Sequence, residues 1–199
     1  MKWTGWTLRL PAGRLILVVA LAGILFVPPL GHADDALWAL LKGGDQVVMM
    51  RHATAPGPND GPDFRLDDCS TQRNLDERGR EEARKIGAAF RARNIPVSAV
   101  RSSQWCRCLE TARLAFGRVE PWTPLNSFFN DRSREPLVTP EVRALAGRRP
   151  EGGNLVLVTH NVNIQAVTGI STLSGEMVVL TPRPDGTFSI AGRLPPSKL

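Results

Sequence analysis

The sequence predicts an α/β fold, a three-layer sandwich with a largely parallel central sheet and helices on both faces. Short apolar runs alternate with segments of helical periodicity, the pattern of a parallel sheet joined by crossover helices. Two of these runs are apolar almost throughout, as expected for strands that are covered on both faces. A chain of 199 residues has room for one such domain with a sizeable core. We therefore expect a leader over residues 1–33 and a single domain over residues 34–199.

The first part of the chain has the pattern of a signal peptide. Three basic residues precede an uninterrupted apolar run over Leu15–Val27, and Pro28, Pro29 and a small-residue sequence ending at Ala33 follow it. We predict cleavage after Ala33. A retained membrane anchor is the alternative, although the run is shorter than the ~20 apolar residues that a spanning helix needs. Either way we expect a periplasmic or otherwise exported domain, which contacts a membrane only through an uncleaved leader.

The first half of the domain contains two expected strands and one helix between them. The run Asp45–Arg51 follows two glycines and leads into a segment rich in proline and glycine, so it is expected to be a buried strand. Apolar residues recur at helical spacing between residues 75 and 93, which predicts an amphipathic helix with Asp76 as a candidate N-cap. The β-branched run Val97–Arg101 predicts a second strand.

The second half continues the alternation. We expect helices over Trp105–Phe116 and Pro140–Ala146, and a fully buried strand over Asn154–Thr159. Two further strands are expected at 177–181 and 187–194, joined by a turn at residues 184–186. In sheets of this kind, ligands bind beyond the carboxyl ends of the strands.

Histidines and arginines stand at three of those expected strand ends. Arg51 and His52 end the first strand, Arg107 follows the second, and His160 ends the third. Guanidinium donors match phosphate oxygens in bidentate fashion and stay charged at any relevant pH. Nearby arginines disfavour a protonated imidazole, so a neutral His52 could attack phosphorus. The pattern therefore predicts a site for a tetrahedral phosphoryl group.

Three ordered motifs make the sequence resemble the histidine phosphatase superfamily, also called the phosphoglycerate-mutase-like family. They are Met50–Ala53 (MRHA), Ser102–Ala112 (SSQWCRCLETA) and Leu157–Asn161 (LVTHN), with a supporting segment from Arg73 to Ala83. The resemblance covers nearly the whole domain. It implies that His52 accepts the phosphoryl group, that Arg51 and Arg107 clamp the phosphate, and that His160 contacts its oxygens.

The residues next to these motifs complete the expected site. Thr54 and Asn161 are candidate substrate-binding residues. Ala53 replaces the family's usual glycine, and Asn161 replaces a glycine or aspartate that commonly follows the second histidine. Because an asparagine cannot protonate a leaving group, we take Asp131 as the candidate general acid. The alternatives are Glu135, Asp67, Asp68 or no protein acid, and we expect neither a metal ion nor a cofactor.

The cysteines and the net charge limit the bonds and partners that the domain can have. One disulfide among Cys69, Cys106 and Cys108 is expected in an oxidising compartment, with Cys69 bonded to Cys106 or Cys108, whereas Cys-x-Cys is not a usual zinc-ligand pair. The net charge of +6 includes the leader, and the arginines are scattered without the basic tract or aromatic row of a nucleic-acid site. A small or envelope-bound phosphomonoester is the expected partner, and no nucleic acid is expected.

Three functions fit this site. The first is an exported phosphomonoesterase, and the stretch Leu125–Phe129 resembles lipopolysaccharide core heptose phosphatases, which implies a cell-envelope phosphosugar as a substrate. The second is a phosphoglycerate-type mutase, which export away from glycolytic intermediates disfavours. The third is a catalytically silent phosphate-binding module, which the nucleophile His52 disfavours.

Overall fold

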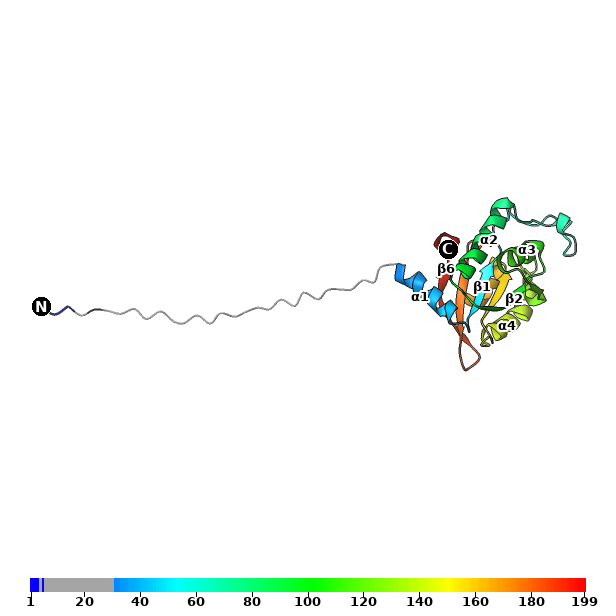
Figure 1. Cartoon of the computed structure of the whole chain (residues 1–199). Helices are drawn as coiled ribbons and strands as arrows, with labels where there is room; N and C mark the ends of the chain where they lie inside the picture. Colours follow the sequence, from blue (N-terminus) through cyan, green and yellow to red (C-terminus); the bar gives the residue numbers. More distant parts are fainter. Residues whose placement is uncertain (4, 6–30) are drawn as a thin grey trace.

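The structure, a computed structural model, describes residues 1–3, 5 and 31–199. A single six-stranded sheet forms the centre of the molecule, and helices cover both of its faces (Figure 1). The predicted α/β sandwich is confirmed. The apolar run Leu15–Val27 lies outside the described residues, so the predicted leader stays a prediction. None of the helices in the described residues is long and apolar enough to cross a membrane.

The sheet has a parallel part and an antiparallel edge. Its strand order is β3-β2-β4-β1-β5-β6. The strands β1 to β4 pair in parallel, whereas β5 runs antiparallel to both β1 and β6. The bounds are β1 Val47–Arg51, β2 Val97–Ser102, β3 Glu120–Pro121, β4 Asn154–Thr159, β5 Met177–Pro182 and β6 Phe188–Leu194. The four parallel strands therefore present their carboxyl ends at one edge of the sheet.

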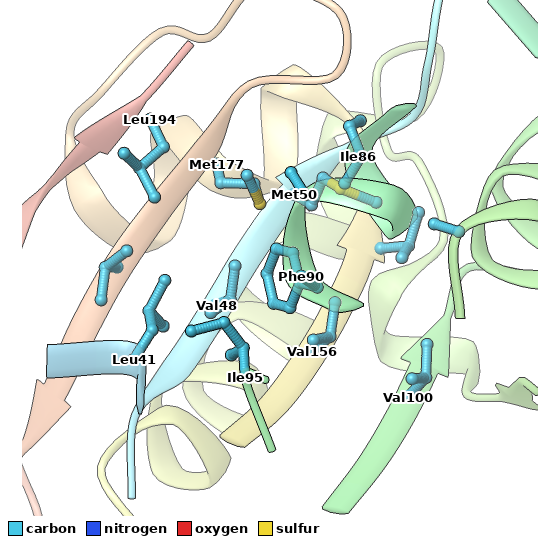
Figure 2. Close-up of a cluster of buried hydrophobic side chains, with 14 of the residues drawn as sticks. Leu41, Val48, Met50, Ile86, Phe90, Ile95, Val100, Val156, Met177 and Leu194 are labelled. Atoms are coloured by element: carbon cyan, nitrogen blue, oxygen red, sulfur yellow. The ribbon is translucent and has the colours of Figure 1, made fainter. Parts of the chain in front are cut away.

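Three helices cover the first face of the sheet: α1 (Gly31–Lys42), α2 (Glu77–Ala92) and α3 (Cys106–Phe116). Side chains at alternate positions of β1 and β4 point to this face because successive strand residues face opposite sides. Figure 2 shows the result, with Val48, Met50 and Val156 of the sheet packed beside Ile86 and Phe90 of α2. This cluster fixes α2 and α3 against the strands that carry the site.

The second face is covered by α4 (Glu135–Ala146) and α5 (Asn161–Thr168). The intervening positions of the same strands, including Met49 and Leu157, pack there against Val142 and Ile164. Both central strands are thus buried on both faces, which explains why the runs Asp45–Arg51 and Asn154–Thr159 are almost wholly apolar.

The predicted strands are confirmed, with bounds within two residues of the observed ones. The predicted N-cap of α2 is also confirmed, because the Asp76 carboxylate accepts from the Gly79 backbone N–H at 2.8 Å. The predicted start of α4 at Pro140 is wrong, because the helix begins at Glu135. Proline is favoured in the first helical turn, and Pro136 takes that place while Pro140 lies inside the helix. Helices α1 and α5 were not predicted, although Leu37, Trp38 and Leu41 recur at helical spacing in α1 and bury against the sheet.

Candidate active site

The register of the parallel strands brings the two predicted histidines together. Arg51 at the end of β1 is paired with Thr159 at the end of β4, so His52 and His160 follow at neighbouring positions. The His52 backbone N–H donates to the Thr159 carbonyl at 3.0 Å, which extends the ladder by one residue. The imidazole ring centroids are 5.5 Å apart. The sheet thus places both rings at one edge.

The His52 imidazole is held as a neutral ring with one nitrogen free. Its Nδ1 lies 2.8 Å from the Ala53 carbonyl oxygen. Because a carbonyl can only accept, Nδ1 carries the proton and Nε2 keeps its lone pair. Burial, followed by the positive charge of Arg107, lowers the pKa of His52 to about 3. A lone pair on Nε2 is therefore available across the neutral pH range.

The second imidazole is also neutral. Burial, followed by the charge of His52, lowers the pKa of His160 well below its ordinary value. The ring nitrogen Nε2 lies 2.9 Å from Ser103 Oγ and 3.5 Å from Cys108 Sγ. When the Ser103 hydroxyl donates to Nε2, the proton of the neutral ring is on Nδ1. In that tautomer His160 is a hydrogen-bond donor.

Three arginines surround the histidines in the same way. In each one, Nη1 donates to backbone carbonyl groups: Arg51 to Thr172 at 2.8 Å, Arg73 to Ala55 at 2.5 Å and Gly57 at 3.1 Å, and Arg107 to Arg73 at 3.2 Å. In each one, Nε is buried and has no hydrogen-bond partner within the described residues. Buried donors in native proteins almost always have an acceptor. Three such donors around one pair of histidines therefore indicate a binding site for an anion with several oxygens.

Arg73 is a site residue that the sequence analysis did not select. It lines the same cavity as Arg51 and Arg107, and its charge contributes to lowering the pKa of His52. It comes from the loop before α2, so it does not stand at a strand end. Its place in the Arg73 to Ala83 segment of the family resemblance was the one signal that could have identified it.

Asp60 is the second site residue that sequence reasoning missed. Its carboxylate is paired with Arg107, at 2.8 Å to Nη1 and 3.1 Å to Nη2, and both side chains are at least nine-tenths buried. Burial opposes ionisation of this carboxyl, but hydrogen bonds from Arg107 and the Arg73 backbone outweigh burial and lower the pKa of Asp60. Asp60 lies in a loop without regular periodicity, so nothing in the sequence marked it.

A cavity of about 430 Å³ opens over this cluster. Its lining combines the histidines and these three arginines with aromatic, polar and charged side chains of the surrounding loops, including Arg132 and Arg134. Asn161 and Val162, the first two residues of α5, also line it. The positive end of a helix dipole favours anions, which adds to the attraction of the arginines. The cavity is therefore suited to a phosphate with an attached organic group.

The acid candidates differ in their relation to the cavity. Asp131 lines it, and its Oδ1 accepts hydrogen bonds from the Ser133 backbone N–H and hydroxyl at 3.2 and 2.6 Å. Glu135 does not line the cavity and pairs with Arg132 at 3.3 Å. Asp67 and Asp68 are also outside the lining, bonded to Arg65 and to Ser70 respectively. Among the four carboxylates considered, only Asp131 is part of the cavity.

The two predicted substrate-binding residues are placed differently. Asn161 lines the cavity, and its Oδ1 accepts from the Thr172 backbone N–H at 2.6 Å, which leaves the amide nitrogen available. Thr54 is not in the cavity lining, and its hydroxyl donates to Glu82 at 2.6 Å. The structure therefore does not bring Thr54 into the site. Its side chain is bonded to Glu82 on α2 instead.

The predicted disulfide joins Cys69 to Cys106, one of the two pairings left open. It ties the loop after β1 to the first residue of α3, next to Arg107. Cys108 is the free thiol, and burial raises its pKa to about 12, so it is not a nucleophile. Arg101 is ion-paired with Glu120 at 3.4 Å, as expected for a strand residue outside the site.

Residues 47–128 match the model of the histidine phosphatase superfamily (branch 1). These residues carry the nucleophile candidate His52 and all three arginines, Arg51, Arg73 and Arg107. This segment has the sequence pattern of the histidine phosphatase superfamily. The expectation that the chain is a histidine phosphatase is thereby confirmed, whereas no curated protein matches the sequence.

Solved structures share the fold of this phosphatase. The protein histidine phosphatase SixA complexed with tungstate superposes with a TM-score of 0.54 at 16% identity, covering 76% of this chain and 97% of that chain. A mycobacterial glucosyl-3-phosphoglycerate phosphatase gives 0.54 at 16% identity, covering 73% and 96%. A mutant phosphoserine phosphatase of Entamoeba histolytica, in complex with phosphoserine, gives 0.53 at 10% identity, covering 77% and 98%. At these identities the likeness establishes the fold alone.

Proposed function

We propose that this chain is an exported phosphomonoesterase that forms a covalent phosphohistidine on His52. The single observation that carries the proposal is the set of three buried, unpartnered Nε donors on Arg51, Arg73 and Arg107 around a neutral imidazole. A phosphoryl group supplies the oxygens that these donors lack, and His52 Nε2 supplies the lone pair that attacks phosphorus.

The first step forms the bond between Nε2 of His52 and phosphorus and breaks the ester P–O bond. The leaving oxygen takes a proton from Asp131, and the phosphoryl group remains on His52. In the second step a water oxygen attacks phosphorus, Asp131 takes a proton from that water, and the P–N bond breaks. Inorganic phosphate and neutral His52 result, so the enzyme returns to its starting state.

The pocket stabilises the transition state through fixed donors. Arg51, Arg73 and Arg107 are anchored by their Nη1 groups, so their free N–H groups need little reorganisation when charge develops on the phosphoryl oxygens. His160 donates from Nδ1 when the Ser103 hydroxyl donates to its Nε2. Cationic neighbours also keep His52 deprotonated, so the same arginines serve both the substrate and the nucleophile.

The substrate proposal is an envelope phosphosugar. It rests on the predicted export and on the resemblance of Leu125–Phe129 to lipopolysaccharide core heptose phosphatases. Ser127 and Phe129 of that stretch line the cavity beyond the phosphate pocket, where a leaving group would lie. The named substrates of the structural relatives, phosphohistidine, phosphoserine and glucosyl-3-phosphoglycerate, are the other phosphomonoesters and phosphoramidates to compare with it.

Phosphate release from a panel of phosphosugars, phosphoserine and p-nitrophenyl phosphate tests the function. The wild-type protein should release phosphate from several of them, and His52→Gln should release none. Arg101→Gln is the matched control, since Arg101 is a sheet arginine that lies outside the cavity lining and pairs with Glu120, and it should retain activity within twofold. Phosphate binding without release from any ester would instead indicate a silent phosphate-binding module.

A further inference from the structure

Both oxygens of the Asp60 carboxylate accept hydrogen bonds from Arg107, although Asp60 lies in an irregular loop. One carboxylate oxygen, Oδ1, accepts from Arg107 Nη1 at 2.8 Å and from the Arg73 backbone N–H at 2.9 Å. The other, Oδ2, accepts from Arg107 Nη2 at 3.1 Å and from the Trp105 indole N–H at 3.2 Å. Both oxygens are engaged by two donors each, so the carboxylate has little freedom to rotate.

This pairing determines which part of Arg107 can meet a ligand. A guanidinium has five N–H groups in a rigid plane. Asp60 takes one from each terminal nitrogen, and the Arg73 carbonyl takes the second on Nη1. The groups that remain are Nε–H and the second N–H of Nη2, which lie side by side along one edge of the guanidinium. That edge is suited to two oxygens of one phosphoryl group.

We infer that Asp60 is a positioning residue for the reaction: it fixes the guanidinium of Arg107 so that the Nε–Nη2 edge is presented to the phosphoryl oxygens. The inference rests on the proposed function. Because its carboxylate is ionised and its oxygens are occupied, Asp60 acts through Arg107 and donates no proton to a leaving group.

The charge of Asp60 also reduces the positive charge around the histidines. Its carboxylate offsets one of the three charges of Arg51, Arg73 and Arg107. Without Asp60, Arg107 keeps only the Arg73 carbonyl to orient it. Without Arg107, the buried Asp60 carboxylate is left unpaired beside the incoming phosphate and repels it. The two residues are therefore expected to act as a unit.

A double-mutant cycle on kcat/KM with p-nitrophenyl phosphate tests the inference. Asp60→Asn should lower kcat/KM on the order of 10–100-fold in the wild-type background, because a displaced clamp costs rate in this range. In the Arg107→Ala background the same change should cause no further loss, and should raise kcat/KM where the orphaned carboxylate repels substrate. Equal fold losses in the two backgrounds would overturn the inference, since they would mean that Asp60 only maintains the loop.

Three further measurements keep the test independent of folding and of the proposed function. Asp63→Asn is the matched control, an exposed carboxylate on the same loop that should change kcat/KM less than twofold. If Asp60→Asn does not fold, Asp60→Glu enters the same cycle and should show the same non-additivity. Calorimetric titration of inorganic phosphate into wild type, Asp60→Asn, Arg107→Ala and the double variant separates the role of Asp60 from the proposed function. Non-additive binding in a protein that hydrolyses no ester refutes the proposed function alone, and additive effects in an active enzyme refute the role of Asp60 alone.

Discussion

At the scale of single residues, the main feature of the site is a neutral imidazole surrounded by arginines. His52 is buried, Arg51, Arg73 and Arg107 surround it, and its Nδ1–H is fixed by the Ala53 carbonyl. Protonation would place a further cation among these three arginines. Burial is the main cause of the pKa of about 3, and the arginines proposed to bind the phosphoryl group lower it further.

Burial of this neutral ring predicts acid sensitivity of the fold. The folded pKa of His52 is about 3 against 6.5 for the exposed group, so between these values the unfolded chain binds a proton that the folded chain does not. The free energy of unfolding must then fall as the pH falls from 6.5 towards 3. Urea denaturation at pH 7 and pH 4.5 should show that wild type loses about 2–3 kcal/mol more than His52→Gln. Equal losses in the two proteins would refute the shifted pKa.

The proposed acid, Asp131, predicts a dependence on the leaving group. An alkoxide needs a proton to depart, whereas p-nitrophenolate does not. Asp131→Asn should therefore keep most activity on p-nitrophenyl phosphate and lose about 100-fold on a sugar phosphate. Glu135 lies outside the cavity, so Glu135→Gln is the control and should keep its activity on both substrates. If Asp131→Asn lowers both rates equally, another group or water protonates the leaving oxygen.

At the scale of elements, one long loop holds much of the site. The chain between β1 and α2 carries Asp60 and Arg73, and it has only a short 3₁₀ helix at Cys69–Thr71. The Cys69–Cys106 disulfide ties it to the start of α3. A further link is made by Gln72, whose Oε1 accepts from the Cys106 backbone N–H at 2.9 Å. These links hold the loop against the helix that carries Arg107.

Loss of the disulfide should therefore weaken both the fold and the phosphate pocket. Closing a loop with a sequence separation of 37 residues stabilises a protein by about 4 kcal/mol in the chain-entropy estimate. Denaturation with and without reductant should show a loss of this order in wild type, together with a higher KM. A variant with both Cys69→Ser and Cys106→Ser is the control and should not respond to reductant. If reductant changes neither the stability nor the KM of wild type, the stabilising role of the disulfide is contradicted.

The sequence indicated those parts of the site that stand on regular elements. Arg51, His52 and His160 meet as expected because a parallel sheet brings the carboxyl ends of its strands to one edge. Asp60 was not found, since its role depends on contacts with Trp105 and Arg107 that no periodicity encodes. The predicted start of α4 was too late in the sequence, because Pro136 and Pro140 could each fit the first turn of a helix. Local patterns thus predicted the framework, and long-range contacts decided the rest.

At the scale of the whole molecule, the expected export requires that the domain keep its packing once the leader is removed. The predicted cleavage after Ala33 falls within α1, and the residues that anchor this helix, Leu37, Trp38 and Leu41, all follow it. Asp34 also pairs with Lys198 near the C-terminus at 3.0 Å. Cleavage at this point therefore leaves the packing of α1 against the sheet intact.

N-terminal sequencing of the protein from the cell that produces it tests the export prediction. The mature chain should begin at Asp34 and be recovered without detergent. A chain that begins at Met1 and remains in the membrane fraction would show that the apolar run is a retained anchor.

The most direct test of the whole account is the chemical state of His52 during turnover. Wild-type enzyme quenched in alkali after mixing with a ³²P-labelled phosphomonoester should hold a label that is stable in alkali and lost in acid, as a phosphoramidate is. Peptide mapping should place the label on His52, and His52→Gln should hold none. Label that persists in His52→Gln, or an active wild-type enzyme that never carries phosphate on His52, would contradict the account.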